Sequence, residues 1–338
     1  MHKYIGIDYH KRFSYGTIML ESGQIVKQSR FENGFANLNN FLGPHSGSGC
    51  HAVLEAGYNS LVMYDWLDEL TESVTLAHPR KVKIIAEAKV KTDKIDSELL
   101  AHLLRCDMIP SAHASSQPAR EAKRLLRHRL FLTKVSTMLK NRIHSLLDGY
   151  PQVRDERPVE RLFTQAGIQW LKGIMLPDCS GKVLANDIAL LEQIIQTMKR
   201  LDKWFAARFQ SDQRITHLRT IPGIGQFFSL LIVAEIDDIH RFAKPAKLHS
   251  YAGLVSTVHS SGGREYHGRL TPECNTYLRY AMIEAVIPAI RKDYSLKQYY
   301  EKIKRRKGSN SAKVATARRL LTIVFRVLKE KRVYRVTE

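Results

Sequence analysis

Residues 4–31, YIGIDYHKRFSYGTIMLESGQIVKQSRF, contain three short runs that are rich in β-branched and aromatic residues. The runs Tyr4–Asp8, Tyr15–Leu20 and Gln24–Phe31 predict three strands, and short turns, the second of which contains a glycine, separate them. Because the connections are short, successive strands should pair side by side in an antiparallel meander. This stretch therefore predicts the first half of a β-sheet.

Helical and extended runs alternate in the residues that follow the meander. Helices are expected at Phe35–Leu42, Leu61–Leu70 and residues 97–105, and strands at residues 51–55 and Val74–Ala77. Strands that alternate with helices form crossover units, in which neighbouring strands run parallel. The amino-terminal part of the chain is therefore predicted to be an α/β domain, with a mixed sheet and helices on its faces.

The rest of the chain is predicted to be mainly helical. Residues 119–148 form a long basic amphipathic helix, and residues 183–209 form a second long helix with apolar residues near heptad spacing. That spacing indicates a coiled-coil arm or, equally, a long helix buried against a neighbour. We expect three parts: residues 1–150 with the sheet and the basic helix, a helical linker or arm at 151–212, and a carboxy-terminal domain at 213–338.

The carboxy-terminal part begins with a glycine-containing turn, Pro222-Gly223-Ile224-Gly225, between two apolar helical stretches. This pattern is typical of a helix–hairpin–helix motif, where glycines let backbone N–H groups approach phosphate oxygens. A simple corner between two helices, without any ligand, is the alternative.

The charge of the chain is distributed very unevenly. The chain carries a formal net charge of +20, yet residues 1–110 contain 12 Lys and Arg against 13 Asp and Glu. The remaining residues contain 41 against 20, so the whole positive excess lies there. Such a surface attracts a polyanion, and nucleic acid is the expected one. An anionic membrane is less suitable, because no amphipathic anchor accompanies the charge.

Four acidic residues stand at the ends of predicted elements. Asp8 and Glu55 each end a strand, and Asp93 and Asp96 lie three residues apart at the start of a helix. Alone, each is typical of a turn or a helix amino terminus. Neighbouring strands, however, would place Asp8 and Glu55 at one edge of the sheet. Carboxylates gathered there would repel one another unless a cation such as Mg²⁺ (or Mn²⁺) bound them.

The motifs GIDYHK, VLEAGYNS and KTDKIDSELLA resemble the Asp-Glu-Asp-Asp set of the IS110 and IS1111 insertion-sequence transposases, a group that includes the Piv/MooV DNA invertases. The resemblance continues through RLLRHRLFLTKVSTMLKNRIHSLL, TIPGIGQFFSLLIVAEIDDIHRF and HSYAGLVSTVHSSGGREYHGRL, and covers most of the chain. It implies a RuvC-like (ribonuclease-H-fold) domain in which Asp8, Glu55, Asp93 and Asp96 hold the metal and assist catalysis.

The resemblance also implies a catalytic serine that precedes a glycine in the carboxy-terminal domain. In His259-Ser260-Ser261-Gly262-Gly263 the matching residue is Ser261, and Ser260 is an adjacent competitor. Its hydroxyl would attack a DNA phosphodiester and form a phosphoserine bond. Basic and turn residues are further candidates for nucleic-acid binding: Arg124, Arg127, Lys140, Arg142, Gly223, Gly225, Arg264, His267, Arg269, Arg279, Lys304, Arg305 and Arg306.

Members of the resembled family use a non-coding guide RNA that pairs with target and donor DNA. The resemblance therefore implies double-stranded DNA and such an RNA as partners. It also implies a dimer or tetramer with active sites that are shared between subunits. The sequence has no membrane span and no signal-peptide pattern, so a cytoplasmic protein, associated with the nucleoid when bound to DNA, is expected.

Three functions are compatible with these residues. The first is a recombinase that uses Ser261 together with the acidic metal site. The second is a RuvC-type nuclease in which water, rather than Ser261, attacks the phosphate. The third is a non-catalytic nucleic-acid-binding protein, whose carboxylates only cap strands and helices.

Overall fold

The computed structural model describes residues 2–85, 92–155, 161–261 and 264–336. Internal packing divides the chain into unit 1, Met1–Ser115, and unit 2, Ser116–Glu338. The long basic helix α5 (Gln117–Asp148) lies in unit 2, whereas the sequence suggested grouping it with the sheet up to residue 150. The reason is that its buried side chains pack against helices of unit 2.

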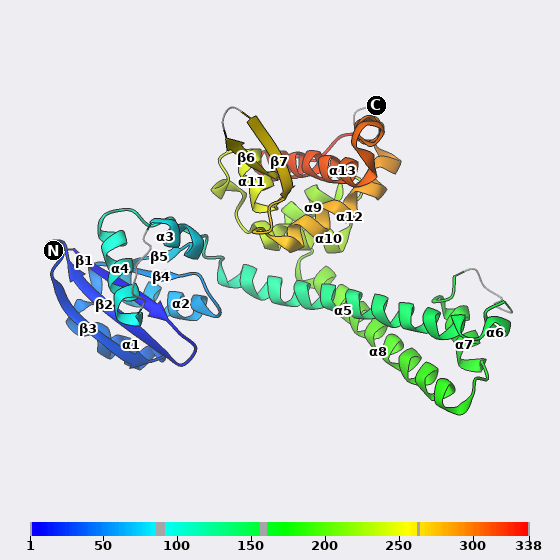
Figure 1. Ribbon diagram of the computed structural model, residues 1–338, viewed down its shortest axis with the longest axis horizontal. Helices are drawn as coiled ribbons and strands as arrows, with labels where there is room; N and C mark the ends of the chain where they lie inside the picture. The colour runs from blue at the N-terminus through cyan, green and yellow to red at the C-terminus, as the bar shows by residue number, and fades with distance from the viewer. Residues whose placement is uncertain (1, 86–91, 156–160, 262–263, 337–338) are drawn as a thin grey trace. The chain divides into compact units, whose positions relative to one another are not determined.

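Unit 1 contains a five-stranded mixed sheet with strand order β3-β2-β1-β4-β5. The pairs β1–β2 and β2–β3 are antiparallel, whereas β1–β4 and β4–β5 are parallel. The predicted meander followed by crossover units is thereby confirmed (Figure 1). The strands are β1 (Lys3–Tyr9), β2 (Phe13–Leu20), β3 (Ile25–Glu32), β4 (Gly47–Glu55) and β5 (Thr71–Ala77).

Two sets of helices cover the two faces of this sheet. Ile5, Ile7 and Leu54 share one buried cluster with the side chains of α1 and α2, whereas Val53 shares another with those of α3 and α4. The alternation follows from the two-residue period of a strand. The helices are α1 (Phe35–Leu42), the short 3₁₀ helix η1 (Gly43–His45), α2 (Ser60–Leu70), α3 (Pro79–Ile85) and α4 (Asp93–Arg105).

Helix α4 approaches strand β1 closely because position 6 is a glycine. A Cβ atom on Gly6 would lie 2.0 Å from the carbonyl oxygen of Ser97 and 2.6 Å from the amide nitrogen of Ala101. Any other residue would therefore force the helix away from the sheet. α4 begins at Asp93, four residues before the expected helix at 97–105, because Thr92 caps it by accepting a hydrogen bond from the Ile95 amide.

Unit 2 is built mainly from helices. The carboxy-terminal half of α5 and the amino-terminal half of α8 share one apolar core, so these two long helices lie side by side (Figure 1). The helices are α5, α6 (Pro151–Asp155), α7 (Gln165–Gly173), α8 (Asp178–Arg208), α9 (Gln213–Arg219), α10 (Gln226–Ile236), η2 (Ile239–Arg241), α11 (Pro245–Tyr251), α12 (Thr276–Lys292) and α13 (Tyr294–Lys329).

Helices α9 to α13 enclose the second core of unit 2, which the amino-terminal end of α5 and the carboxy-terminal end of α8 complete. The turn between α9 and α10 fits into this core. Gly223 has a φ of +87°, and a Cβ there would lie 2.3 Å from the carbonyl oxygen of Ala285 in α12. Because Gly223 has no side chain, the turn can pack closely on α12. α13 is kinked at Gly308, whose φ is +80°.

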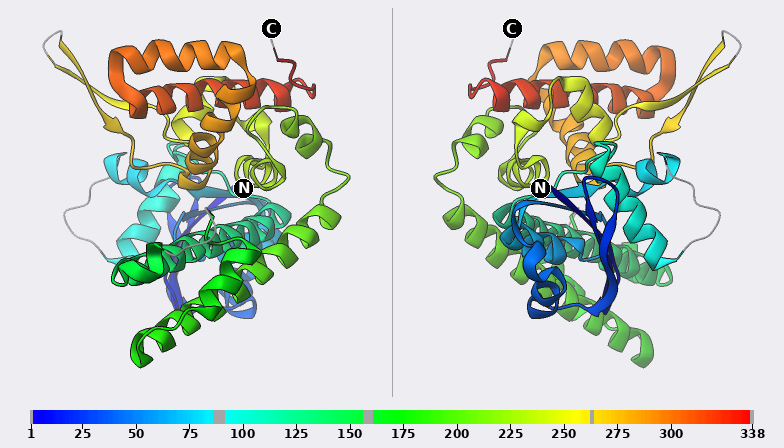
Figure 2. Two further views of the ribbon diagram at one scale, coloured as in Figure 1. Left: turned by 90° about the vertical axis from the view of Figure 1, so that its right-hand side faces the viewer. Right: turned by 90° about the vertical axis from the view of Figure 1, so that its left-hand side faces the viewer.

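A two-stranded hairpin, β6 (Ser256–Ser261) and β7 (Arg264–Leu270), extends from the helices of unit 2 (Figure 2). Its strands are antiparallel, and Ser261 pairs with Arg264 at the last described step before the turn. The side chains of residues 258–267 and the whole of residues 262–263 lie outside the described part of the chain. Among the described helices, none is both long and apolar enough to cross a membrane.

Candidate metal centre and nucleic-acid interface

Strand register places Asp8 and Glu55 at one edge of the sheet. The parallel pairing of β1 with β4 runs up to Ile7 and Leu54, and the two acidic residues are the next residues along the two strands. Because side chains alternate, Asp8 shares a face with Gly6, and Glu55 shares it with Val53. That face is the one covered by α4. The prediction that both carboxylates stand at the same edge is confirmed.

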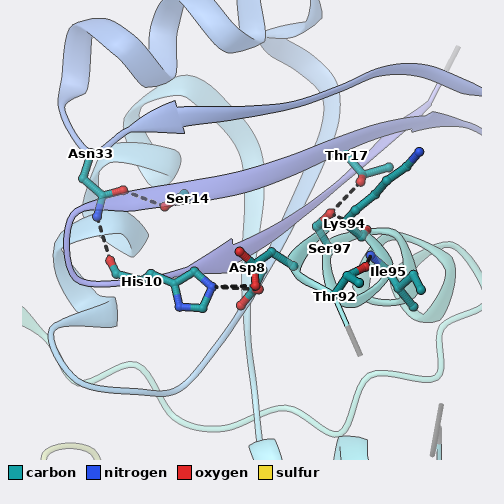
Figure 3. A network of polar contacts seen from close by, with 10 residues as sticks. Asp8, His10, Ser14, Thr17, Asn33, Thr92, Lys94, Ile95 and Ser97 are labelled. Carbon is teal, nitrogen blue, oxygen red and sulfur yellow. Dashed lines mark hydrogen bonds and ion pairs between the residues drawn. The ribbon is translucent and has the colours of Figure 1, made fainter. Parts of the chain in front are cut away.

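The first turn of α4 carries Asp93 and Asp96 to the same edge. The position of the helix is fixed by the close approach at Gly6 and by a buried side-chain contact, 2.7 Å long, between the hydroxyl oxygens of Thr17 in β2 and Ser97 in α4. Gln28 of β3 extends this contact, because its side-chain amide donates to the Thr17 hydroxyl at 2.8 Å. Figure 3 shows α4 next to Asp8 in this arrangement.

A histidine joins the acidic residues, and sequence reasoning missed it. His10 Nε2 lies 3.2 Å from an oxygen of Asp8 (Figure 3). It also lies 3.2 Å from an oxygen of Asp93. The only signal in the sequence was its spacing, two residues after Asp8 and thus on the same side of an extended chain. Its backbone is held in place because the Asn33 side-chain amide donates to the His10 carbonyl at 2.7 Å.

The other acidic residues are less tightly grouped. Asp8, His10 and Asp93 each offer a ligand atom, and these atoms all lie within 4.8 Å of one another. Asp96 is close enough to influence Asp8 electrostatically, but it is outside this group of three. Glu55 is exposed at the end of β4 and is also outside the group.

The electrostatics of the site favour a bound cation. Burial raises the pKa of Asp8, the neighbouring His10 lowers it, and the carboxylates of Asp93 and Asp96 raise it again. A carboxyl group that is partly buried among other carboxylates gains stability when a divalent cation offsets their repulsion. His10 Nε2 is shielded from solvent and faces the carboxylates of Asp8 and Asp93, so its lone pair also suits a metal bound between them. Both observations fit a divalent ion held by these residues.

The candidate nucleophile lies in the other unit. Ser261 is the final residue of β6, and Ser260 precedes it in the same strand. Their side chains, like those of Arg264 and His267, lie outside the described part of the chain. Arg269 is exposed on β7.

Several basic candidates for nucleic-acid binding are engaged within the protein. Arg127 Nε and its terminal nitrogen lie 2.7 and 2.8 Å from the two oxygens of Glu235, whose side chain is completely buried. Arg279 donates to the carbonyl oxygens of Ala252 and Thr271 and so holds the loop before α12. Three further contacts are looser: Arg142 with Asp187, Lys304 with Glu301, and Lys140 over the ring of Phe163.

Other candidates face solvent. Arg124, Arg305 and Arg306 are exposed, and a Cβ on Gly225, at the start of α10, would meet nothing within 4 Å. A groove of about 520 Å³ lies between the foot of the hairpin and α13. Its lining combines apolar and polar residues with three cations, Arg306, Lys307 and Arg318. Within the described chain, no carboxylate lies at ion-pair distance from these three cations.

A mixed sheet with this strand order, with carboxylates at the carboxyl ends of its central parallel strands, is that of the ribonuclease-H-like fold. Comparison with known proteins identifies the family within this fold class. Residues 5–151 match the DEDD transposase family of the IS110 type, and residues 215–301 match the family described as "Transposase IS116/IS110/IS902 family". The chain belongs to this transposase family and is a DNA transposase.

Individual relatives agree with this assignment. The chain is 24% identical to a "Probable family 20 transposase" of Pseudomonas aeruginosa over 85% of its own length and 86% of the relative. It is 24% identical to the "Transposase for insertion sequence element IS1111A" of Coxiella burnetii, over 77% of its own length and 72% of the relative. The chain is also 30% identical to the "Insertion element IS110 uncharacterized 43.6 kDa protein" of Streptomyces coelicolor. This match is shorter and covers 33% of the chain and 28% of the relative.

Proposed function

We propose that this transposase cuts and rejoins DNA strands through a covalent bond between Ser261 and a 5′ phosphate, assisted by Mg²⁺ or Mn²⁺ at Asp8, Glu55, Asp93 and Asp96. The observation that carries this proposal is the convergence of Asp8 and Asp93, from a strand end and a helix start, at one edge of the sheet. Such an arrangement suits a divalent ion in phosphoryl transfer.

The chain's own residues would act as follows. The Ser261 oxygen attacks the phosphorus, the bond from phosphorus to the 3′ oxygen breaks, and that oxygen leaves as a 3′ hydroxyl after it takes up a proton. The serine proton passes to solvent or to a base. A divalent ion, when bound, offsets the negative charge that develops on the phosphate. The phosphoserine ester retains the energy of the broken bond, so the strand can be rejoined to a new end without ATP.

The carboxylates orient the ion and bind no DNA themselves, because their charge repels phosphate. Binding of DNA is assigned to the basic unit 2, with the exposed Arg124, Arg305 and Arg306, together with Arg269 and Gly225, as its first contacts. Arg264 and His267 flank the proposed nucleophile in sequence and would bind the phosphate under attack. The +21 excess on this part of the chain supports two polyanionic partners, DNA and a guide RNA.

We further propose that the active protein is a dimer or tetramer. We also propose that α5 and α8 form a coiled-coil arm. In the same way, we propose that α9 and α10 form a helix–hairpin–helix motif. In that motif the open position at Gly225, rather than the packed Gly223, would approach phosphate.

The test is a search for the covalent intermediate. Full-length protein is incubated with labelled DNA, guide RNA and Mg²⁺ or Mn²⁺, and the products are separated on a denaturing gel. We expect a labelled band at the mass of a protein–DNA adduct. Ser261→Ala should abolish it, because the attacking oxygen is absent, whereas the matched control Ser260→Ala should retain it.

Two outcomes would overturn the proposal. If Ser261→Ala still forms the adduct, the nucleophile is another residue. If wild-type protein cleaves DNA and forms no adduct, the enzyme is a nuclease that uses water. Asp8→Asn should bind DNA as well as the wild type and form no adduct, so it separates a loss of chemistry from a loss of binding.

A further inference from the structure

We propose that His10 is a direct ligand of the metal ion, so that the centre is a mixed nitrogen and oxygen site with a preference for a transition-metal ion such as Mn²⁺ over Mg²⁺. This inference rests on the proposed metal centre and names one more ligand and the class of ion. It is carried by the position of the imidazole nitrogen, which lies 3.2 Å from a carboxylate oxygen of each of two acidic residues. Figure 3 shows the His10 ring pointing toward Asp8.

The distances match those of ligands around one ion. Two ligands at right angles about an octahedral ion, each about 2.1 Å from it, lie about 3.0 Å apart. His10 Nε2 lies 3.2 Å from the nearest oxygen of Asp8 and 3.2 Å from that of Asp93. All three ligand atoms lie within 4.8 Å of one another, so a single ion can reach them together.

The surroundings of Nε2 are dominated by the two carboxylates. The atom itself is shielded from solvent, although the His10 side chain as a whole is 40% exposed, and it lies at ion-pair distance from one oxygen of each carboxylate. A divalent ion at this point would accept the nitrogen lone pair together with a lone pair from each carboxylate. It would also offset the repulsion between the two acidic groups.

The imidazole is also held in place independently of any metal. The His10 amide donates to the Phe13 carbonyl at 3.0 Å, and Asn33 bonds the His10 carbonyl. The ring itself lies against the Phe13 ring, with 4.8 Å between centroids. The backbone contacts do not depend on the side chain, so a substitution of His10 should leave the fold of this segment unchanged.

The chemical consequence concerns the choice of metal. Mg²⁺ is bound almost entirely through oxygen atoms, whereas imidazole nitrogen favours transition-metal ions. A centre of carboxylates with one histidine therefore favours Mn²⁺ over Mg²⁺ more strongly than an all-carboxylate centre would. Because His10 supplies the nitrogen ligand, its substitution should remove this preference for Mn²⁺ over Mg²⁺.

The experiment uses full-length, tag-free protein with Mn²⁺ at one fixed pH and no DNA. Pulsed electron paramagnetic resonance detects the coupling between Mn²⁺ and a directly bonded ¹⁴N nucleus, and calorimetry gives the affinities for Mn²⁺ and Mg²⁺. We expect a ¹⁴N coupling in the wild type that His10→Asn abolishes. Its Mn²⁺ affinity should fall about tenfold or more, and its Mg²⁺ affinity by less.

Two control variants identify the source of the signal. His102→Asn, on the same unit and in α4, should retain the ¹⁴N coupling, and Asp8→Asn should lose both the coupling and the tight Mn²⁺ site. Bound Mn²⁺ without ¹⁴N coupling in the wild type would overturn the role of His10 and leave the proposed function intact. A coupling that survives in His10→Asn or Asp8→Asn would overturn it as well. Absence of any Mn²⁺ or Mg²⁺ binding would instead contradict the metal centre of the proposed function.

Discussion

At the scale of single residues, the basic helix α5 serves two different purposes. Arg124 is exposed, whereas Arg127, one turn further on, forms a two-bond ion pair with Glu235. Glu235 also accepts a hydrogen bond from the Asn275 side chain at 2.8 Å. The buried carboxylate therefore connects α5, α10 and the start of α12, and Arg127 supplies the charge that makes its burial tolerable.

Arg127→Ala should lower the free energy of unfolding by roughly 3 kcal/mol, because it leaves Glu235 buried without its main counter-charge. We place the loss at the lower end of the range for buried pairs because the Arg127 side chain is itself 39% exposed. Chemical denaturation of the full chain measures the change. The matched substitution Arg124→Ala should change stability by less than about 0.5 kcal/mol. Equal effects of the two substitutions would show that the pair with Glu235 does not stabilise unit 2.

At the scale of secondary-structure elements, the geometry of the proposed metal centre depends on how closely α4 packs on β1. Asp8 belongs to the strand and Asp93 to the helix, so the distance between the two elements sets the spacing of the ligands. Gly6 makes the close approach possible, and the contact between Thr17 and Ser97 fixes the helix along the sheet. Gly6 takes no part in the proposed chemistry, yet it controls the distance between Asp8 and Asp93.

Gly6→Ala should destabilise unit 1 by at least about 2 kcal/mol, because the added methyl group meets the backbone of α4 rather than a movable side chain. It should also weaken Mn²⁺ binding, since Asp93 moves away from Asp8. Thermal unfolding and calorimetry measure the two effects. Gly57→Ala is the control, because a Cβ there meets nothing within 4 Å and should change neither quantity much. An undisturbed Mn²⁺ affinity in Gly6→Ala would contradict this account.

The sequence predicted the part of the site that depends on local pattern. Strand ends and the two-residue period were sufficient to place Asp8 and Glu55 at one edge. They could not identify His10, because its position depends on Asn33, 23 residues further along the chain. Nor could they separate Arg127 from Arg124, because the distinguishing partner, Glu235, is 108 residues away. Local periodicity predicts elements, whereas long-range contacts decide which side chains remain available.

At the scale of the whole molecule, the boundary between the two structural units is also the boundary between a nearly neutral and a strongly basic part of the chain. Residues 111–115 contain no Lys, Arg, Asp or Glu, so unit 1 has the balance of 12 basic against 13 acidic residues. Unit 2 has 41 against 20. The acidic residues of the proposed metal centre therefore lie in a nearly neutral unit, and we expect the attraction for nucleic acid to come from the other unit.

Binding of the full chain to double-stranded DNA should weaken steeply with salt. If six to ten phosphates are contacted, the affinity should fall by about 10³ to 10⁵ between 50 and 200 mM salt. Arg306→Ala, on the cationic groove, should reduce the slope of log affinity against log salt by about one. Gel-shift titrations at several salt concentrations provide the measurement.

The control for this measurement is Lys81→Ala, which removes an exposed cation from α3 of unit 1. We expect its slope to equal that of the wild type, since unit 1 has no positive excess. A slope that changes for Lys81→Ala and not for Arg306→Ala would place the main contact with DNA on unit 1 and contradict the division by charge.

The neutrality of unit 1 has a consequence for the cell that harbours such an element. A cutting centre that drew DNA to itself would damage chromosomes at random, and a mobile element perishes with its host. In the proposed function, the centre gains little long-range attraction to the genome, so we expect it to meet a phosphodiester after the basic unit has bound DNA. Harm to the host would then be limited, because the residues that attract DNA and the residues that are proposed to cut it lie in different units.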